Sequence, residues 1–313
     1  MKNNKYQSFS LNTDSKLQQI NLLSFVNTTC SLSLLRDDQI HPFVSGNKFR
    51  KLKYNIQQAL TENHKTLLTF GGAYSNHIAA VASAGKLAGL QTVGIIRGEE
   101  LSNKISENAT LSYAQKQGMQ LQFITREAYR DKYEASFIET LRNTYGDFYL
   151  LPEGGTNALA VKGCEEIFSR VEKHVDYICA PVGTGGTLAG LVGASQPHQK
   201  VLGFSALKGK FQTSEIQKYT SKTNFEIIDD YCFGGYAKID LQLVRFINEF
   251  YKKTGIPLDP VYTGKMLFGI VDLLKRGYFK ENSRIFAVHT GGLQGIAGMN
   301  QRLKKKNLPQ IDL

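Results

Sequence analysis

Three glycine-rich turns in this chain have residue types that suit the binding of anions. They are 70–77 (FGGAYSNH), 180–187 (APVGTGGT) and 289–292 (HTGG), and each follows a strand-like run and opens a helix. In open α/β sheets, ligands bind at the carboxyl ends of the strands, and helix N-termini present free N–H groups to anions. Three such turns therefore predict that several anionic groups bind together, and a phosphate plus a carboxylate would fit.

The second turn has the residues of a phosphate cradle. Its glycines let the backbone approach a ligand closely, and its two threonine hydroxyls can donate to phosphate oxygens. These residues are Gly183, Thr184, Gly185, Gly186 and Thr187. A dinucleotide fingerprint would need glycine at position 188, which is leucine, and no lysine follows the glycines as it does in a P-loop. A tight turn without a ligand is the alternative, and the residue types favour phosphate.

The first turn is open to two interpretations. Ser75 and Asn76 stand where the turn enters a helix, and both are good N-cap residues, so capping explains them as well as carboxylate binding does. The GxSxG pattern of a nucleophile elbow is not satisfied around Ser75. His77 taken alone is more typical of a structural histidine.

Three further residues could do chemistry but are not distinctive in their own neighbourhoods. Lys48 lies in a polar turn, 45–50 (SGNKFR), that we expect to precede a helix, and it is one of many lysines. Tyr236 follows two glycines, and Tyr262 follows a Pro-Val pair. Residues of these types are more often a solvated amine and packed phenols than catalysts.

The elements that must position these residues alternate along the chain. We expect strands at 66–70, 91–97, 119–125, 148–151, 175–180, 201–206 and 284–288, and helices at 78–90, 104–117, 158–173, 239–254 and 264–276. This alternation predicts the α/β class, with parallel sheets covered by helices. The length of 313 residues suits one large domain or two closely joined ones.

Composition narrows the range of partners. The formal net charge of +11 could attract nucleic acid, but no nucleic-acid-binding motif accompanies it, so we interpret it as a solvated basic surface. The lysine run 304–306 is expected to be exposed. No apolar stretch of about 18 residues occurs, and the N-terminal region has no apolar signal core, so we expect a cytoplasmic protein without membrane contact.

The four cysteines give no sign of a metal site or of disulfides. Cys30, Cys164, Cys179 and Cys232 are far apart and form no CxxC pair. We therefore expect reduced thiols in or near the core, and no bound metal.

Eight motifs together are more specific than any one of them. In chain order they are 35–38 (LRDD), 45–52 (SGNKFRKL), 71–77 (GGAYSNH), 152–157 (PEGGTN), 183–190 (GTGGTLAG), 235–236 (GY), 259–265 (DPVYTGK) and 289–292 (HTGG). On these motifs nearly the whole chain resembles the family of 1-aminocyclopropane-1-carboxylate deaminases and D-cysteine desulfhydrases. Members of that family use pyridoxal phosphate (PLP) and have the tryptophan-synthase-β fold.

The resemblance implies two domains, each an open, mainly parallel twisted sheet flanked by helices. Residues 53–154 would form the smaller domain, and 1–52 together with 155–313 the larger, PLP-binding one. A homodimer that acts on a small amino acid is also implied.

The resemblance also implies roles for single residues. Lys48 would form the Schiff base with PLP, and Asn76 would bind the phenolic oxygen of PLP. The substrate carboxylate would lie at Ser75, Asn76 and His77, and Ser75 would also be catalytic. The implied phosphate loop is 183–187, and the implied active-site tyrosines, catalytic and substrate-binding, are Tyr236 and Tyr262.

Two positions divide the family. Deaminases that open the cyclopropane ring carry Glu after the PVY tyrosine and Leu in the H-x-G-G motif, whereas desulfhydrases carry Thr at both. This chain has Thr263 and Thr290, so it resembles the desulfhydrases, and Thr290 is implied to contact PLP. A carboxylate beside the pyridine nitrogen keeps it protonated and makes a strong electron sink, while a hydroxyl favours prompt loss of a good leaving group such as sulfide. The expected reaction is β-elimination on D-cysteine to pyruvate, ammonium and sulfide.

Three alternatives stay open on sequence grounds. One is the ring-opening deaminase, which yields 2-oxobutanoate, and another is a PLP enzyme acting on serine or L-cysteine. The third is a non-catalytic PLP-binding or polyanion-binding protein, which Lys48 disfavours because a binder needs no Schiff base. The chain also departs from the family's Pro-Gly-Tyr-Gly setting at 234–237 (GGYA), and 211–230 is divergent.

Overall fold

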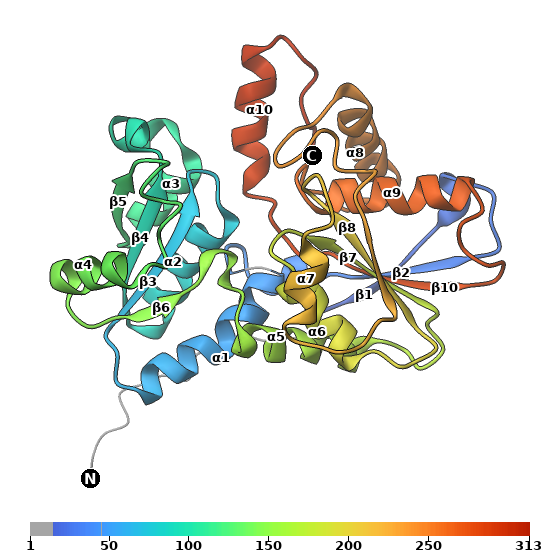
Figure 1. Ribbon diagram of the computed structural model, residues 1–313. Helices are drawn as coiled ribbons and strands as arrows, with labels where there is room; N and C mark the ends of the chain where they lie inside the picture. Colours follow the sequence, from blue (N-terminus) through green and yellow to red (C-terminus); the bar gives the residue numbers. More distant parts are fainter. Residues whose placement is uncertain (1–14, 45) are drawn as a thin grey trace.

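Two sheets organise residues 15–44 and 46–313, which are the residues that the computed structural model describes. Ser45, from the predicted lysine turn, and residues 1–14, from the predicted larger domain, lie outside the described residues. Figure 1 shows the sheets in two lobes, with α1 (Asn47–Thr61) and α5 (Ala158–Glu165) packed together where the lobes join.

The larger sheet has the strand order β1-β2-β10-β7-β8-β9. All neighbours are parallel except the antiparallel pair at the β1 edge. Its strands are β1 (Leu17–Ile20), β2 (Ser31–Leu35), β7 (Tyr177–Val182), β8 (Lys200–Ser205), β9 (Phe225–Ile228) and β10 (Arg284–Val288). Strand β10, the last in the chain, thus lies between two strands that come much earlier.

Alternating side chains bury both faces of this sheet, as expected when helices cover a parallel sheet on both sides. In β7, Tyr177 and Cys179 pack against α8 (Leu241–Thr254) and α9 (Thr263–Lys275). Their neighbours Ile178 and Ala180 join the opposite core, with side chains of α5 and α6 (Gly186–Ala194). The packing on both faces therefore holds the sheet rigidly, and it also fixes the positions of the turns at the ends of its strands.

The smaller sheet is entirely parallel, in the order β5-β4-β3-β6. Its strands are β3 (Thr66–Gly72), β4 (Gln91–Arg97), β5 (Gln120–Ile124) and β6 (Tyr149–Leu151). One face packs on α1, α2 (Asn76–Ala88) and α3 (Ala109–Lys116), and the other packs on α4 (Ala135–Tyr145). The predicted α/β class is therefore confirmed, while the domain boundaries at 53 and 154 stay a prediction.

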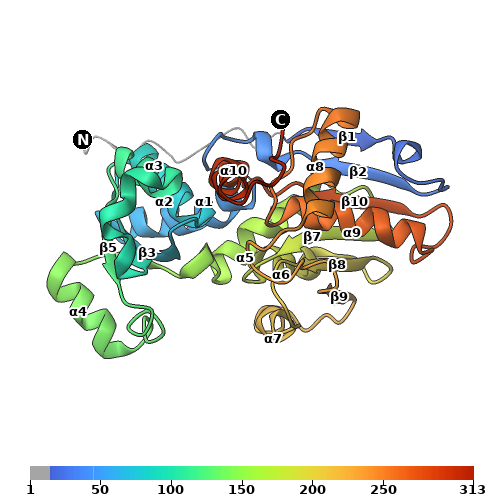
Figure 2. The same ribbon diagram turned by 90° about the horizontal axis from the view of Figure 1, so that it is seen from above.

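The helix α10 (Gly295–Lys305) links the lobes, because it follows β10 in the larger one and contacts α3 in the smaller one. Figure 2, seen from above, shows it end-on between α3 and α8. The remaining helix, α7 (Gln212–Gln217), lies in the segment that diverges from the family.

Several expected elements differ from the observed ones. Strands 91–97 and 284–288 are confirmed as predicted. The single helix predicted at 104–117 is wrong, because Asn108 caps a new helix there by accepting from the Leu111 N–H at 3.0 Å, and a 3-10 segment precedes it. The helix predicted at 158–173 ends at Glu165 and continues as a 3-10 segment. The helix expected after the 289–292 turn is α10, and five strands or helices had no counterpart in the sequence prediction: β1, β2, β9, α4 and α7.

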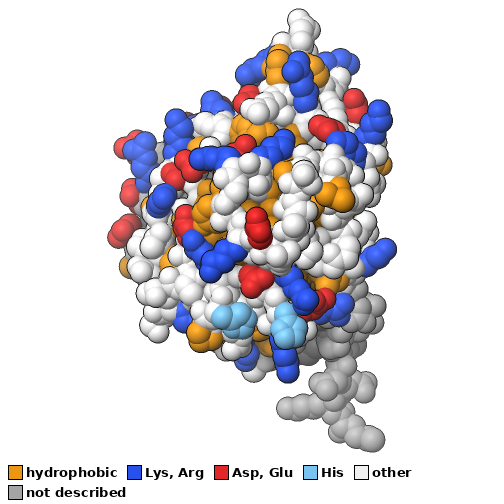
Figure 3. All heavy atoms as spheres, turned by 90° about the vertical axis from the view of Figure 1, so that its right-hand side faces the viewer, with side chains coloured by type: hydrophobic (Ala, Val, Ile, Leu, Met, Phe, Trp, Pro, Cys, Tyr) orange, Lys and Arg blue, Asp and Glu red, His pale blue; other side chains and the backbone are white. Residues whose placement is uncertain are grey.

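The surface and the cysteines agree with the expectations from composition. On the face in Figure 3, basic side chains are scattered among acidic ones and do not gather in one patch. The lysine run 304–306 is exposed, and all four cysteines are free, three of them buried. None of the helices in the described part of the chain combines the length and apolar character that a membrane crossing requires.

Candidate active site

A cavity of about 520 Å³ lies where the carboxyl ends of β3, β7 and β10 meet, and all three glycine-rich turns line it. This volume is typical of small-molecule sites. Of the predicted site residues, all except Gly186 line the cavity: Lys48, Ser75, Asn76, His77, Gly183, Thr184, Gly185, Thr187, Tyr236, Tyr262 and Thr290. The fold therefore brings together residues that are up to 242 positions apart in the sequence, since Lys48 and Thr290 share one wall.

Lys48 is the second residue of α1, so the prediction that it lies in a turn before the helix is wrong. The helix begins at Asn47, because the backbone of Gly46, the residue before it, is not helical (φ 59°). Burial, and after it the positive charge of Lys51, lowers the pKa of the Lys48 amine to about 7. At neutral pH a large share of this amine is uncharged and can attack a carbonyl carbon.

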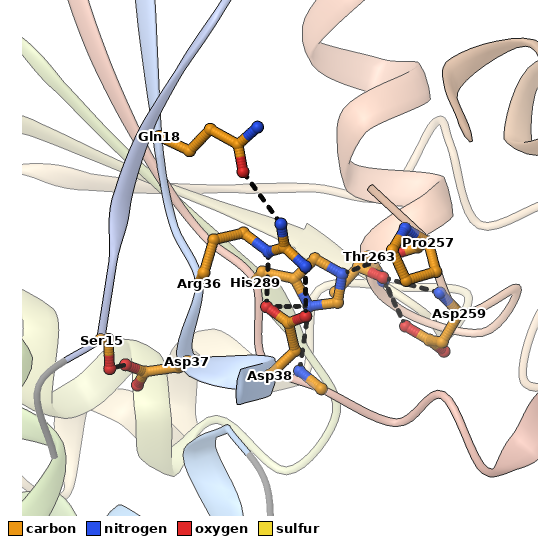
Figure 4. Close-up of polar contacts among 10 residues, drawn as sticks. Ser15, Gln18, Arg36, Asp37, Asp38, Pro257, Asp259, Thr263 and His289 are labelled. Carbon is orange, nitrogen blue, oxygen red and sulfur yellow. Dashed lines mark hydrogen bonds and ion pairs between the residues drawn. The ribbon is translucent and has the colours of Figure 1, made fainter. Parts of the chain in front are cut away.

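A buried ion pair fixes the start of α1. Arg50 donates two hydrogen bonds, of 2.9 and 3.0 Å, to the carboxylate of Asp37. The same carboxylate accepts from the Ser15 hydroxyl, a contact that Figure 4 shows. The Gly46 N–H donates to the Asp37 carbonyl at 2.8 Å. The loop after β2 and the first turn of α1 are therefore held together on either side of Lys48.

A second buried network holds the third turn. Arg36 donates to both carboxylate oxygens of Asp38, at 2.8 and 2.7 Å, and His289 Nδ1 lies 3.5 Å from the same carboxylate (Figure 4). His289 Nε2 lies 2.8 Å from the Pro257 carbonyl and donates to it. The network thus orients the residue that precedes Thr290. The 35–38 motif was noted in the sequence, but this role required the three-dimensional contacts.

Lys51 is the site residue that the sequence analysis missed. Its side chain is 2% exposed, and Nζ donates to the Gly154 carbonyl, Thr156 Oγ1 and Thr184 Oγ1 at 3.1, 2.9 and 3.3 Å. Burial lowers its pKa to about 8. Lys51 lies three positions after Lys48, a spacing that places two side chains on one face of a helix, and this was the available signal.

The cradle around Lys51 fits a phosphate. Lys51 faces the N-terminus of α6, where Gly185 is left-handed (φ 88°), so a cation and the positive end of a helix dipole converge. A Cβ on Gly186 would lie 3.2 Å from Lys51 Nζ, so only glycine leaves this approach open. Among the described residues no carboxylate pairs with Lys51. An anion from outside the chain would balance the charge.

The first turn meets the third. Ser75 caps α2, because its Oγ accepts a hydrogen bond from the Ile78 N–H at 3.4 Å. Ser75 also lines the cavity, so it is both a helix cap and a residue of the cavity wall. A Cβ on Gly292 would lie 2.7 Å from Asn76 Nδ2. The free N–H groups at the start of α2 therefore face the cavity beside Thr290, which suits a carboxylate.

His77, in the first turn, is buried, at 2% exposure. Its Nε2 lies 2.8 Å from the Thr69 hydroxyl, and that hydroxyl donates its only proton to the Leu151 carbonyl. Nε2 must therefore carry a proton and donate, which leaves Nδ1 unprotonated. Burial, with the charges of Lys48 and Lys51, holds the pKa of His77 well below its usual value, so the ring is neutral.

Two tyrosines form one wall of the cavity. The rings of Tyr236 and Tyr262 meet edge to face, with 6.3 Å between their centres. Burial raises the pKa of both phenols, and at Tyr262 the neighbouring Tyr236 and Asp259 raise it further. Both phenols therefore keep their protons at neutral pH and can donate them. The Lys265 ammonium holds the loop before Tyr236 by donating to the Cys232 and Gly235 carbonyls, at 2.7 and 2.9 Å.

The two threonines that mark the family branch lie in different places. Thr290 lines the cavity, whereas Thr263 is fully buried, is not among the residues lining the cavity, and donates its hydroxyl to Asp259 Oδ1 at 2.7 Å. The Asp259 carboxylate also accepts from the N–H groups of Val261, Tyr262 and Thr263, at 2.7 to 3.0 Å. The Thr263 hydroxyl thus closes the turn that carries Tyr262.

The described residues contain no group of three or more His, Cys, Asp or Glu side chains placed to hold a metal ion.

Known proteins resemble this chain over most of its length. The model of the pyridoxal-phosphate dependent enzyme family matches residues 14–291. A Pyrococcus horikoshii protein, provisionally named 1-aminocyclopropane-1-carboxylate deaminase, is 32% identical over 86% of each chain. The D-cysteine desulfhydrase of Klebsiella pneumoniae strain 342 is 29% identical, over 86% of this chain and 88% of that one.

A solved structure shares the whole fold. The crystal structure described as an ACC deaminase homologue superimposes with a TM-score of 0.80 and 27% identity, over 96% of this chain and 95% of that one. The cradle, the buried amine and these matches have one explanation in common. The chain belongs to the family of pyridoxal-phosphate dependent enzymes, among relatives named 1-aminocyclopropane-1-carboxylate deaminase and D-cysteine desulfhydrase, and PLP is its cofactor.

Proposed function

We propose that this enzyme catalyses β-elimination on D-cysteine, giving pyruvate, ammonium and sulfide. The observation that carries the proposal is the meeting, in one cavity, of an amine with a pKa of about 7 and two protonated phenols. Elimination needs a base that takes the α-proton and an acid that can assist the departing group. Lys48 supplies the first, and Tyr236 or Tyr262 the second.

The cofactor's binding groups follow from the cradle. Lys51 and the N–H groups at the start of α6 would hold its phosphate, together with the hydroxyls of Thr184 and Thr187. Asn76 would donate to its phenolic oxygen, and Thr290 would contact its ring. When bound, PLP withdraws electrons from the α-carbon of the amino acid joined to it.

The chain's own groups then move the protons. The substrate carboxylate lies at the start of α2, beside Ser75, Asn76 and His77. Lys48 Nζ takes the proton from the α-carbon, and the electron pair of that bond allows the Cβ–S bond to break. The sulfur leaves with its electron pair and takes a proton from Tyr262 or Tyr236. The remaining aminoacrylate reacts with water and gives pyruvate and ammonium.

The preference for sulfide loss over ring opening rests on the branch-marking threonines. Thr290 puts a hydroxyl on the cavity wall where the ring-opening deaminases carry Leu, and Thr263 replaces their Glu. Without that Glu the cofactor ring is a weaker electron sink, which suffices for a good leaving group. Ring opening is the second candidate, because the Pyrococcus horikoshii relative at 32% identity has a deaminase name.

The deciding assay compares three substrates on the purified enzyme with PLP. We expect sulfide and pyruvate from D-cysteine, at most slow turnover of L-cysteine, and no 2-oxobutanoate from 1-aminocyclopropane-1-carboxylate. Formation of 2-oxobutanoate without sulfide would reverse the order of the two candidates.

Lys48→Ala separates an enzyme from a mere PLP-binding protein. The variant should lose the visible absorbance of the lysine-bound cofactor and all turnover, because Lys51, the other lysine that lines the cavity, is held at the phosphate cradle by its hydrogen bonds. Lys53→Ala, on the same helix but paired with Glu166 outside the cavity, is the matched control. An unchanged spectrum in Lys48→Ala would contradict the assignment.

The remaining parts of the proposal concern the assembly. We propose a cytoplasmic homodimer in which 53–154 is the smaller domain, as the family resemblance implies. Light scattering of the PLP-loaded enzyme measures the mass directly, and a monomer at micromolar concentration would contradict the dimer.

A further inference from the structure

The outer wall of the cavity has two arginines, one from each lobe. Arg97 is the last residue of β4, and Arg302 lies in α10. Both line the same cavity as Lys48. The elimination described above gives neither of them a role, because the cradle binds the phosphate and the start of α2 binds the α-carboxylate.

Arg97 is held over the first turn. Its guanidinium carbon lies 5.6 Å from the centre of the Tyr129 ring, which is itself only 3% exposed. Its Nη2 lies 3.7 Å from the position that a Cβ on Gly72 would take, and Gly72 begins the turn that leads to Asn76. Arg97 is exposed, and its guanidinium therefore lies at the solvent-open side of the cavity, beside the turn that leads to Asn76.

Arg302 approaches the same region from the other lobe. Its Nη1 donates to the Ala237 carbonyl at 3.3 Å, one residue after Tyr236. Burial raises the pKa of Tyr236, and the charge of Arg97 opposes that rise, which means that Arg97 also acts at this phenol. Arg302 thus lies beside Tyr236, and Arg97 lines the same cavity from the other lobe.

The positive charge of the two arginines is not balanced within the described residues. Neither guanidinium forms an ion pair with a carboxylate there. Glu153 also lines the cavity, but the ammonium of Lys132 lies 3.3 Å from its carboxylate. Two arginines on a partly enclosed wall favour a bound anion, because a guanidinium matches the geometry of a carboxylate.

Cysteine has only one carboxylate, so it leaves these arginines without an anion. We propose that Arg97 and Arg302 form a second anion site, which binds a carboxylate at the far end of the substrate's β-substituent. This rests on the proposed β-elimination and specifies its substrate class as cysteine thioethers with an acidic S-substituent. The Cβ–S bond breaks as before, the sulfur takes a proton, and the acidic thiol leaves. Water converts the remainder to pyruvate and ammonium.

The test uses two substrates of equal size on the PLP-loaded enzyme. S-(2-carboxyethyl)cysteine has the distal carboxylate, and its carbamoyl analogue has a neutral amide in the same place. Both are assayed as D and L forms by pyruvate release. We expect a preference of about tenfold or more in kcat/KM for the acid, as is typical of a charge-assisted hydrogen bond. Equal rates for acid and amide would overturn the proposal without any variant.

Two variants locate the effect. In Arg97→Gln and in Arg302→Gln we expect the acid-to-amide preference to fall towards unity, while Lys304→Gln, on the exposed side of α10, keeps it. A preference that survives in both arginine variants overturns the site. Equal losses on cysteine, acid and amide would also overturn it, because they would assign the arginines to the α-carboxylate.

Failure of the proposed function is distinguishable from failure of this site. If no thioether and no cysteine release pyruvate, the β-elimination is wrong, and binding is then measured by the absorbance change of the bound PLP. Tighter binding of the acid than of the amide, lost in Arg97→Gln, still supports the anion site. Equal dissociation constants for the two compounds contradict it.

Discussion

At the residue scale, Lys48 and Lys51 show how burial changes the chemistry of an amine. Their pKa values fall to about 7 and about 8 because desolvation penalises the charged amine, and the charge of Lys51 adds to the effect at Lys48. Lys48 gains reactivity from this environment. Lys51 remains a donor to two hydroxyls and a carbonyl, ready for an anion.

Replacing Lys51 should weaken the cofactor's phosphate contact without removing the reactive amine. We expect Lys51→Met to raise the dissociation constant for PLP by about tenfold or more, the effect of losing a charge-assisted hydrogen bond. Titration of the cofactor-free variant with PLP, followed by absorbance, measures this. Lys53→Met is the control on the same helix, and equal affinities in the two variants would argue against a phosphate at the cradle.

How far single residues could be predicted depended on the range of their contacts. The glycines and threonines of 183–187 predict an anion-binding turn from their residue types alone. Lys51 could have been found by helical spacing, had the helix start at Asn47 been recognised. The roles of Arg36 and Arg50 could not be predicted, because the sequence does not show that their carboxylate partners are buried. That burial becomes plausible only once β2 and β10 are known to be adjacent.

At the element scale, the start of α1 packs directly against the third turn. A Cβ on Gly46 would lie 2.0 Å from the Thr290 carbonyl oxygen, well inside contact distance. Two buried networks, Arg50 with Asp37 and Arg36 with Asp38, hold the two sides of this contact. The position of α1 and the position of the third turn are therefore coupled, because the atoms in contact belong to the backbone and cannot move aside as a side chain could.

A pair of glycine substitutions isolates this contact. Gly46 and Gly89 both have left-handed backbones, with φ of 59° and 69°, but a Cβ on Gly89 would meet nothing within 4 Å. We expect Gly46→Ala to lose PLP binding and turnover, and Gly89→Ala to lose only about 1 kcal/mol of stability from backbone strain. Thermal unfolding and PLP titration measure the two effects. Similar PLP affinities in both variants would show that the packing of α1 on the turn is unimportant.

Elements were predicted best where the chain has buried parallel strands. The apolar runs at 91–97 and 284–288 could be read directly, because both faces of such strands are buried. The helix α3 was predicted to start too early, since Asn108 was not recognised as its cap. Edge strand β1 and the short α7 have too few residues for a period to be visible.

At the scale of the whole molecule, burial lowers the pKa values of three lysines among the described residues of the cofactor-free protein. The pKa of Lys265 is lowered to about 8 by burial, as those of Lys48 and Lys51 are lowered. In the unfolded chain all three bind protons up to about pH 10.4. Between pH 7 and that value the unfolded state therefore binds more protons than the folded one.

Stability of the cofactor-free protein should accordingly rise with pH, because it rises wherever the unfolded state binds more protons. We expect the melting temperature to increase from pH 7 to about 8.5, the ordinary pKa of a thiol. Above this range Cys164 and Cys179, whose pKa values are raised by burial, act in the opposite direction. Lys265→Met should reduce the slope. A melting temperature that falls over this range would contradict the expectation.

The position of β10 has a consequence for the synthesis of the chain. Because Arg284–Val288 pairs with β2 on one side and β7 on the other, the central part of the larger sheet cannot close before the ribosome has passed residue 288. Until then β2 and β7 each present an open strand edge, which is a site for unwanted pairing between nascent chains. The smaller sheet, complete by Leu151, has no such delay. Assembly of the PLP site therefore has to wait for β10, and a chain whose translation stops before this strand cannot complete that site.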